Sequence, residues 1–255
     1  MVELKSEAAI QAMREAGRIV ARALAAARDQ AVVGSCLRDL DQVAADELGR
    51  SGARSTFLGY QPSWAPRPFP AVTCVSVNDV IVHGIPGDYR LRDGDLVSID
   101  CGAELEGWTA DAAISVTVGR SRPDDHRLIA TAEEALAGAI AEARPGKRLG
   151  DISAAIGRIG RAAGFGIPRG FGGHGIGRVM HEDPHVPNDG RAGRGLMLRP
   201  GLVLALEPML TAGGRDEYTT MPDGWALRTV DGGRAAHVEH TVAVTSSGPM
   251  VLTRP

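Results

Sequence analysis

The sequence predicts a mixed α/β (α+β) protein in which a single domain, residues 1–255, consists of two related halves, about 1–120 and 121–255. Three observations support this fold class. Helix-like segments precede strand-like segments in each half, judged from the spacing of apolar residues. The chain is 44% hydrophobic and 23% charged, which permits a large buried core and is typical of globular proteins. The third observation is a pair of internal matches.

These matches relate the two halves to each other. One alignment places Gly34, Leu37, Asp39, Leu40 and Gly52 on Gly146, Leu149, Asp151, Ile152 and Gly164. The other places Leu91-Arg92-Asp93-Gly94 on Leu198-Arg199-Pro200-Gly201, and Asp100 on Glu207. Each match is short, but together they indicate two halves that can bring one carboxylate each to a central axis.

The first half opens with two helical patterns. Residues 6–29 carry apolar side chains at helical spacing after Ser6, which can cap the first turn. A second helix is expected over residues 37–50, ended by Ser51-Gly52. Residues 53–70 should be irregular, because the run QPSWAPRPFP holds four prolines that lack the backbone N–H of a helix or central strand.

Strand-like segments follow, and the same order returns in the second half. AVTCVSV, VIVHG, DLVSIDCGA and AAISVTV are predicted strands, with a hairpin turn at Glu106-Gly107 between the last two. Helices are then expected over residues 123–143 and 149–163. GLVLALEPML and HVEHTVAVT are the strand-like runs of the second half.

Composition argues against several classes of protein. The formal charge of −3 gives no electrostatic reason to expect a nucleic-acid or membrane partner. The three cysteines form no C-x-x-C pair, so a disulfide framework or structural zinc site is not expected. MVELKSEAAI lacks the apolar run of a signal peptide, and no apolar stretch reaches the roughly 20 residues of a membrane span. We expect a cytoplasmic protein, and the many arginines, alanines and glycines suggest a GC-rich bacterial source.

Two carboxylates lie within apolar strand patterns. Strand alternation places Asp100 on the face of Leu96 and Ser98, and it places Glu207 on the face of Val203 and Ala205. An unpaired buried carboxylate is costly, so each of these acids needs a cation, a hydrogen-bond network or a metal ion.

Two further acids favour a metal ion as the partner of these carboxylates. Asp111 lies across the predicted hairpin from Asp100, and Glu239 is in another strand-like run. Any one of the four could be a hydrogen-bonded structural acid. Four acids together with an isolated Gly-His-Gly favour a site for divalent first-row metals, in which carboxylates can bridge two ions.

The segment GFGGHGIGRVMHEDPH provides histidines for such a site. Its glycines match G-x-G-x-x-G, but Pro184 interrupts the helix that dinucleotide binding requires, so we reject that function. The glycines more simply let the backbone pass close to a metal and direct His174 at it. His181 could be a ligand, a proton shuttle or a substrate donor, and His83 in VIVHGIP is a second candidate. The histidines assigned structural roles are His126, His185 and His237.

Seven runs together resemble the motif set of the type I methionine aminopeptidases. They are SVNDVIVHGIPGD, DGDLVSIDCGA, GWTADAAISVTVG, GGHGIGRVMHEDP, LEPM, DGWALRTVDG and VEHTVAVT, and they span nearly the whole chain in the family's order. The resemblance implies the pita-bread fold, with two halves related by a pseudo-twofold axis, a curved central antiparallel sheet and outer helices. It also implies a hydrolase that removes the N-terminal methionine from nascent proteins, favouring a small second residue.

The resemblance further implies the residues of the active site. The five metal ligands fall on Asp100, Asp111, His174, Glu207 and Glu239, and they would hold two divalent ions, with Asp111 and Glu239 bridging. A hydroxide shared by the two ions would attack the scissile carbonyl, with Glu207 exchanging its proton. His181 and the metals would stabilise the oxyanion, and His83 would bind the scissile amide nitrogen. The pocket for the methionine side chain would be lined by Tyr60, Phe69, Cys74, Met180 and Trp225, with Cys74 as a packing thiol.

The chain departs from the family pattern at three points. No Cys/His-rich N-terminal extension is present, which is typical of the short bacterial form. The proline-rich loop between Tyr60 and Phe69 is longer than in the simplest members, and Met180 replaces a common phenylalanine. Both of these last departures concern the pocket and its selectivity.

Two alternatives remain at this point. One is an Xaa-Pro aminopeptidase or prolidase, whose usual large N-terminal domain and histidine pattern are not seen here. The other is a binding protein of the same fold that has lost its metal ligands, which the five ligand-type residues oppose. The expected cofactors are two ions of Co, Mn, Fe or Zn, since carboxylate-rich sites discriminate weakly among them. The expected partners are nascent chain N-termini and, transiently, the ribosome, with no membrane or sequence-specific nucleic acid, for a monomeric enzyme.

Overall fold

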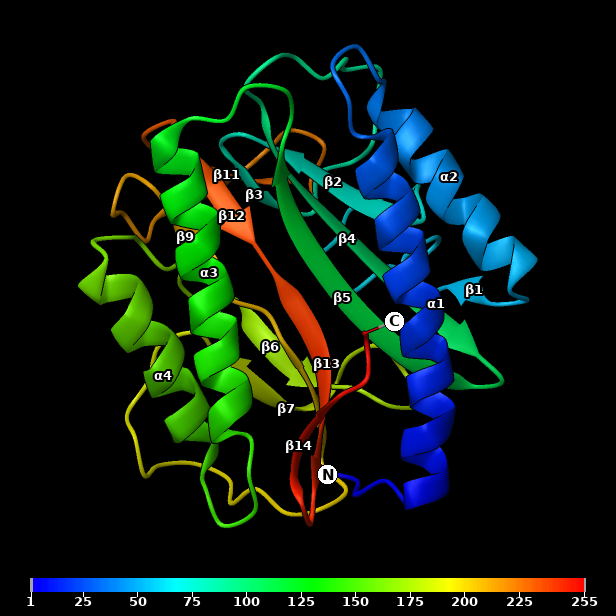
Figure 1. The fold of residues 1–255 in the computed structure, drawn as a ribbon, viewed down its shortest axis with the longest axis vertical. Helices are drawn as coiled ribbons and strands as arrows, with labels where there is room; N and C mark the ends of the chain where they lie inside the picture. Colours follow the sequence, from blue (N-terminus) through cyan, green and yellow to red (C-terminus); the bar gives the residue numbers. More distant parts are fainter. Residues whose placement is uncertain (1, 255) are drawn as a thin grey trace.

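The computed structural model describes residues 2–254 as a curved antiparallel sheet with four helices (Figure 1). The helices are α1 (Glu7–Gln30), α2 (Leu37–Arg50), α3 (Pro123–Glu142) and α4 (Leu149–Ala162). The strands of the first half are β1 (Arg54–Ser55), β2 (Thr73–Val77), β3 (Val80–Val82), β4 (Leu96–Leu105) and β5 (Trp108–Thr117). Those of the second half are β6 (Gly172–Gly175), β7 (Glu182–Pro187), β8 (Val203–Leu206), β9 (Met209–Thr211), β10 (Tyr218–Thr220), β11 (Leu227–Thr229), β12 (Ala235–His237), β13 (Glu239–Thr245) and β14 (Gly248–Val251).

The four helices lie where the hydrophobic spacing predicts them. The hydroxyl of Ser6 accepts a hydrogen bond from the backbone N–H of Ala9, as expected of an N-cap. The helix expected over residues 37–50 is confirmed by α2, which begins and ends at those residues. Helices α3 and α4 each end one residue before the expected boundary, which is within the usual uncertainty of helix ends.

The main sheet has nine strands, and β13 joins its two halves. Its order is β1-β4-β5-β13-β8-β6-β7, with β2 pairing β4 and β14 pairing β13. The long β4–β5 hairpin turns at Glu106-Gly107, where both residues have positive φ, so the predicted turn is confirmed. At the centre, Glu239 of β13 pairs with Ala113 of β5, and Thr241 pairs with Ala205 of β8.

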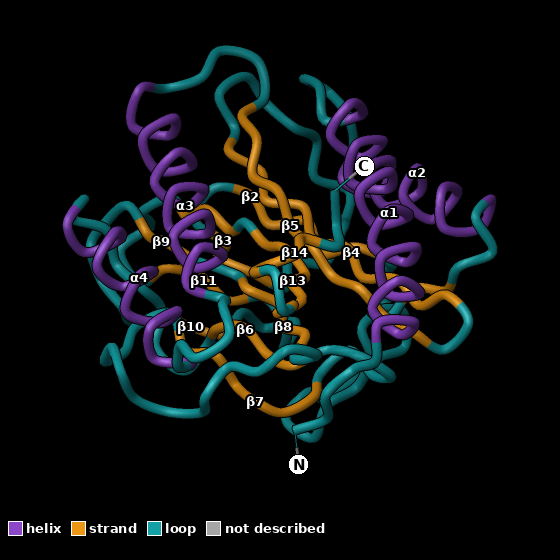
Figure 2. Tube along the Cα trace, turned by 60° about the horizontal axis from the view of Figure 1, so that its bottom comes forward, coloured by secondary structure: helices purple, strands orange, loops and turns teal. Residues whose placement is uncertain are grey.

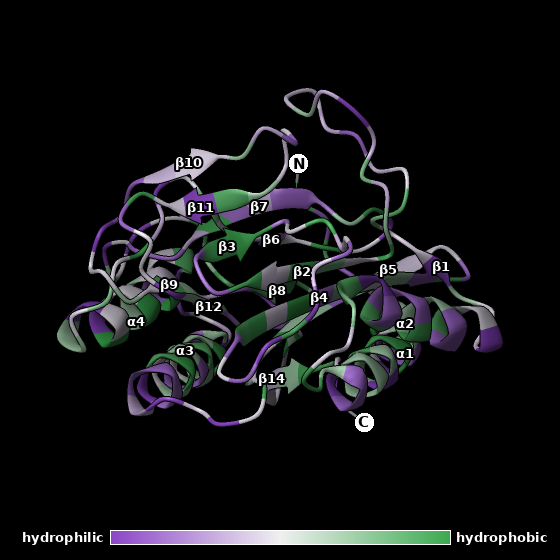
Figure 3. Cartoon of the chain, turned by 90° about the horizontal axis from the view of Figure 1, so that it is seen from above, coloured by the Kyte–Doolittle hydropathy of each residue, from purple (hydrophilic) through white to green (hydrophobic). Residues whose placement is uncertain are grey.

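The helices all lie on one side of the main sheet, and β3, β10 and β11 lie on the other (Figure 3). Figure 2 shows the same separation from another direction, with α1 and α2 beside one end of the sheet and α3 and α4 beside the other. Two hydrophobic cores fill the helix side, one under each helix pair. The opposite face of the sheet is therefore not covered by these two cores.

Corresponding loops of the two halves make matching hydrogen bonds. The backbone N–H of Gly34 donates to the Leu91 carbonyl, and that of Gly146 donates to the Leu198 carbonyl. The side chain of Asp39 accepts from the backbone at the start of α2, and Asp151 does so at α4. These residues are the ones paired by the internal sequence matches, which supports two halves of common design.

The structure corrects several strand expectations. Strand β8 ends at Leu206, so Glu207 lies just beyond it and is not inside a continuous strand, because Pro208 interrupts the backbone hydrogen bonding. The run HVEHTVAVT is likewise divided, with His237 ending β12 and Glu239 beginning β13. Residues 53–70 are irregular as expected, apart from the two-residue strand β1. No helix in the described part of the chain is long and apolar enough to cross a membrane.

Candidate metal centre and substrate pocket

A cavity of about 340 Å³ is lined by side chains of the main sheet and by His83 and Trp225, which lie next to β3 and β11 in the chain. All twelve residues predicted for the site line it: Tyr60, Phe69, Cys74, His83, Asp100, Asp111, His174, Met180, His181, Glu207, Trp225 and Glu239. They come from both halves of the chain, so the fold brings together positions that are far apart in sequence.

The four acids converge from separate parts of the sheet. Asp100 and Asp111 come from β4 and β5, Glu239 from the first position of β13, and Glu207 from the break after β8. Asp111 lies across the hairpin from Asp100, as expected, but the two residues are not direct partners. Asp100 pairs with Ala113, and Asp111 pairs with Gly102. The two aspartates therefore lie on the same face of the hairpin, offset diagonally and not directly opposite.

The acid side chains leave several buried oxygens without hydrogen-bond donors. Within residues 2–254, no hydrogen-bond partner is found for Oδ1 of Asp100, Oδ1 of Asp111 or Oε1 of Glu239. Burial is the first cause of a raised pKa for each acid, and neighbouring carboxylates add to it for Asp100, Glu207 and Glu239. The pKa of Asp111 rises to about 7. Clustered acids with unsatisfied oxygens are stable as anions only beside a cation.

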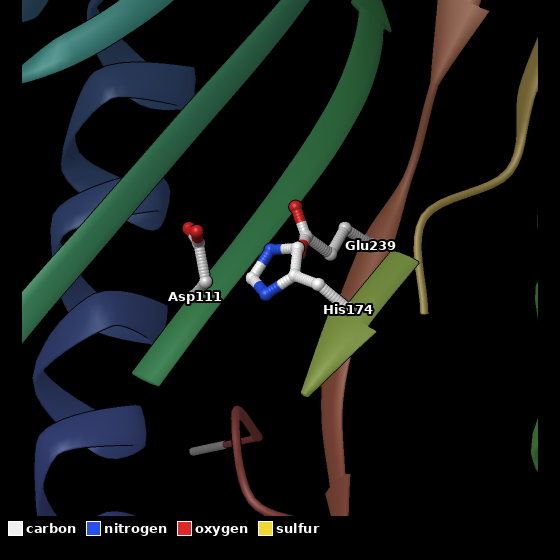
Figure 4. A group of neighbouring side chains, drawn as sticks. All are labelled: Asp111, His174 and Glu239. Atoms are coloured by element: carbon white, nitrogen blue, oxygen red, sulfur yellow. The ribbon is translucent and has the colours of Figure 1, made fainter. Parts of the chain in front are cut away.

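His174 is oriented as a ligand toward this cluster. Its Nδ1 donates to the Gly175 carbonyl at 2.8 Å, which leaves Nε2 with its lone pair 3.8 Å from Oε1 of Glu207. Burial and the neighbouring His181 lower the pKa of His174 to about 3, so the imidazole is neutral. Figure 4 shows Asp111, His174 and Glu239 pointing toward one another from β5, β6 and β13. One possible ligand atom from each of these residues lies within 4.8 Å of the other two.

His83 and His181 lie beside the cluster and are held by aromatic rings. His181 stacks on Tyr60 with ring centroids 5.4 Å apart, and its Nδ1 is 3.0 Å from the Tyr60 hydroxyl. His83 has a positive φ of 59°. Its ring lies 6.1 Å from that of Trp225, and burial lowers its pKa to about 4. Burial also lowers the pKa of His181, so both imidazoles can exchange hydrogen bonds with a ligand in the cavity as neutral groups.

Much of the remaining cavity wall is apolar. Phe57, Phe69, Cys74, Met180 and Trp225 form one buried cluster against which Tyr60 packs. Burial and the nearby aspartates raise the pKa of the Cys74 thiol well above its ordinary value, so it stays protonated and does not act as a nucleophile. One end of the cavity thus suits an apolar side chain, while the other suits a cation.

The structure adds residues that the sequence interpretation missed. Trp64, from the proline-rich loop, lines the cavity and stacks on His83 at 6.0 Å, although its own exposed fraction is 56%. Phe171 contacts the edge of the same imidazole, and His185 also lines the cavity. His237, for which a structural role is expected, has its Nε2 3.7 Å from Glu207 and 3.7 Å from Glu239. The only sequence signal for His237 was its spacing of two residues from Glu239.

The donor set fits divalent cations. The orphaned carboxylate oxygens and the neutral imidazole of His174 are hard and borderline ligands of the types preferred by first-row metals. A curved sheet with buried acids and imidazoles beside an apolar pocket is the arrangement of a metal-dependent hydrolase.

Comparison with known proteins identifies which metallopeptidases share this arrangement. Residues 11–246 match metallopeptidase family M24. The chain is 47% identical to methionine aminopeptidase 1 of Mycobacterium tuberculosis over 260 residues, covering 99% of this chain and 95% of that protein. The crystal structure of methionine aminopeptidase from Thermotoga maritima, 38% identical, superimposes with a TM-score of 0.95 over the full length of both chains. The chain therefore belongs to the M24 metallopeptidases and, within them, to the methionine aminopeptidases.

A prolidase comparison bears on the alternative enzyme of the same fold. The prolidase of Pyrococcus furiosus has a TM-score of 0.76 and 22% identity, with 99% of this chain covering 65% of that protein. This likeness concerns the fold alone. It places this chain in the pita-bread fold that both kinds of enzyme share, while the higher identities are to methionine aminopeptidases.

Proposed function

We propose that this chain removes the N-terminal methionine from nascent polypeptides whose second residue is small. The observation that carries the proposal is the division of one cavity into a cluster of four buried acids with His174 and an apolar wall containing Met180 and Trp225. The acid end suits the scissile peptide group, and the apolar end suits an unbranched side chain.

The metal site is proposed to hold two divalent ions. Asp100, Asp111, His174, Glu207 and Glu239 would hold these ions. The ions, chosen in the cell from Co, Mn, Fe or Zn, would polarise the substrate carbonyl and supply an activated water.

The protein side chains then handle protons and orientation. Glu207 takes the proton from the attacking water and returns it to the leaving amine. His181, held by Tyr60, donates toward the developing oxyanion, and His83 binds the amide nitrogen of the second residue. Rings of Trp64, Phe171 and Trp225 surround His83, with centroids 5.9–6.1 Å from that of the imidazole, and we propose that they limit the size of the second residue.

The remaining expectations extend this proposal to the cell. The chain acts as one catalytic domain of two halves, and the matching loop contacts at Gly34 and Gly146 support that division. We propose that the enzyme works as a monomer in the cytoplasm and meets emerging chains through a transient ribosome contact, without binding a membrane or a specific nucleic-acid sequence.

Glu207→Gln tests the function most directly. The substitution keeps the side-chain shape but removes the proton acceptor, so kcat for a Met-Ala peptide should fall at least about a hundredfold. Near-normal turnover by the metal-loaded variant would refute the role of Glu207. Parallel assays of Met-Ala and Xaa-Pro peptides separate this activity from that of a prolidase, and metal analysis of protein purified without added metal identifies the ions.

A further inference from the structure

His237 occupies a fixed and deeply buried position near the acid cluster. It ends β12, and its exposed fraction is 2%. Its backbone N–H donates to the Ser115 hydroxyl at 3.0 Å, and the Ser115 hydroxyl in turn donates to its carbonyl at 2.8 Å. The backbone of His237 is thereby held against β5, which is also the strand that carries Asp111.

The imidazole of His237 is directed at two of the acids. Its Nε2 lies 3.7 Å from Oε2 of Glu207 and 3.7 Å from Oε2 of Glu239. Among the residues that the structure describes, this nitrogen has no hydrogen-bond partner. Glu207 therefore lies between two imidazoles, with Oε1 toward His174 and Oε2 toward His237.

A direct hydrogen bond does not explain this arrangement. At 3.7 Å, the nitrogen-to-oxygen separations exceed the range of such bonds, and an unpaired buried ring nitrogen carries a desolvation cost. A shared cation does explain it. Two donors that each lie about 2.0–2.2 Å from one ion can be as much as about 4 Å apart.

We propose that Nε2 of His237 is an additional ligand of the metal centre, shared with Glu207 and Glu239. This inference rests on the proposed metal centre and extends its ligand set from five protein side chains to six. A second imidazole makes the site richer in nitrogen, and nitrogen donors favour Co, Fe or Zn over Mg or Ca.

The test is Co²⁺ binding to the full-length chain, measured by isothermal titration and by X-ray absorption at the cobalt edge. His237→Gln retains a polar side chain of similar reach but has no imidazole. It should weaken at least one Co²⁺ binding step by about tenfold or more, and it should reduce the count of bound imidazoles from two to one. His174→Ala should also leave one, now from His237.

His185→Gln provides a matched control in the same cavity. His185 pairs with His174 across β6 and β7 and lines the cavity, but it is not in either group of possible metal ligands, which contain Asp111, Glu207 and Glu239 with His174 or His237. Its substitution should leave the count of bound imidazoles at two. Should His237→Gln fail to fold, the spectrum of the wild-type protein decides by itself, since a single bound imidazole there would overturn the proposal.

The other outcomes also discriminate. Wild-type Co²⁺ affinity in His237→Gln would overturn the assignment, and so would weakened affinity with an unchanged imidazole count, which would make His237 a positioning residue. In both cases weaker Co²⁺ binding in His174→Ala, with one bound imidazole fewer than in the wild type, would show that the proposed metal centre itself still stands. Absence of Co²⁺ binding to the wild-type protein would instead refute the metal centre.

Discussion

Gly173 permits the close approach of strands that positions His174, and Gly173→Ala should disrupt that approach. A Cβ added at Gly173 would lie 2.1 Å from the carbonyl oxygen of Ala205. Carbon and oxygen that are not bonded to each other stay roughly 3.2 Å or more apart, so the strands would have to separate by about 1 Å. The glycine is thus needed for contact between β6 and β8.

Strand β6 is the one expected to move. Ala205 is fully buried in β8, and the other edge of β8 is paired with β13. Strand β8 therefore cannot shift away from β6. His174 follows Gly173 directly and would be carried away from Glu207. Overpacking of this kind costs about 1–3 kcal/mol. At roughly 2–4 °C per kcal/mol for a chain of this size, the Tm of the metal-free protein should fall by about 2–12 °C.

The metal affinity should fall as well, because ligand distances tolerate errors of only about 0.2 Å. We expect at least about a tenfold weaker Co²⁺ affinity, measured by isothermal titration beside thermal unfolding. Gly49→Ala is the control, since its added Cβ would meet no atom within 4 Å and alanine is the better helix former. Wild-type Tm and Co²⁺ affinity in Gly173→Ala would refute the reasoning.

Three further predictions concern the cavity. His174→Ala should lose Co²⁺ affinity, whereas His83→Ala should keep its metal content and lose turnover; equal metal loss in both would show that a ligand was misassigned. The metal-free protein should lose stability from pH 6.5 to 8. The pKa of Asp111 is about 7 in the folded chain and 3.8 in its ordinary state, so the folded chain holds a proton that the unfolded chain has already released. Raising the pH removes that proton and with it the stability that it provides. Buried histidines with lowered pKa act in the opposite sense, but only below their ordinary 6.5, so a Tm that rises over this window in chelator would contradict the burial argument. Met180→Phe should sharpen the preference for Met over norleucine peptides in kcat/KM without changing metal content, because methionine adapts its shape and phenylalanine does not. Unchanged selectivity would show that Met180 does not contribute to this preference.

Local patterns were enough to predict much of the fold. The boundaries of α2 follow from apolar spacing and from Ser51-Gly52, and the turn of the long hairpin follows from Glu106-Gly107. Both depend on interactions between residues a few positions apart, which sequence reveals directly. Pro208 also indicates the end of a strand at Glu207, since proline cannot donate a backbone hydrogen bond. The apolar run GLVLALEPML nevertheless favours a continuous strand, and that expectation is wrong.

The convergence of the acids was only partly predictable. Alternation along each strand shows that Asp100 has a neighbouring apolar face, but it does not show which strands lie side by side. The pairing of β13 with β5 on one edge and with β8 on the other brings Glu239 between Asp111 and Glu207. Such pairing depends on long-range contacts, which for β13 and β5 join residues more than a hundred positions apart. Here the family resemblance, rather than periodicity, indicates the complete set.

Trp64 and His237 show where sequence reasoning fails for physical reasons. The proline-rich loop has no periodicity, and its position depends on distant partners, such as the Trp225 indole that donates to the Arg67 carbonyl at 3.0 Å. His237 does carry a signal, because a residue two positions before a buried strand acid points to the same face. Strand spacing indicates which way the His237 side chain points, but it does not indicate which residues lie next to it. The imidazole lies near both Glu207 and Glu239 because the chain passes from β12 into β13 at this point. A histidine near a buried acid in strand spacing should therefore be weighed as a ligand even when no motif contains it.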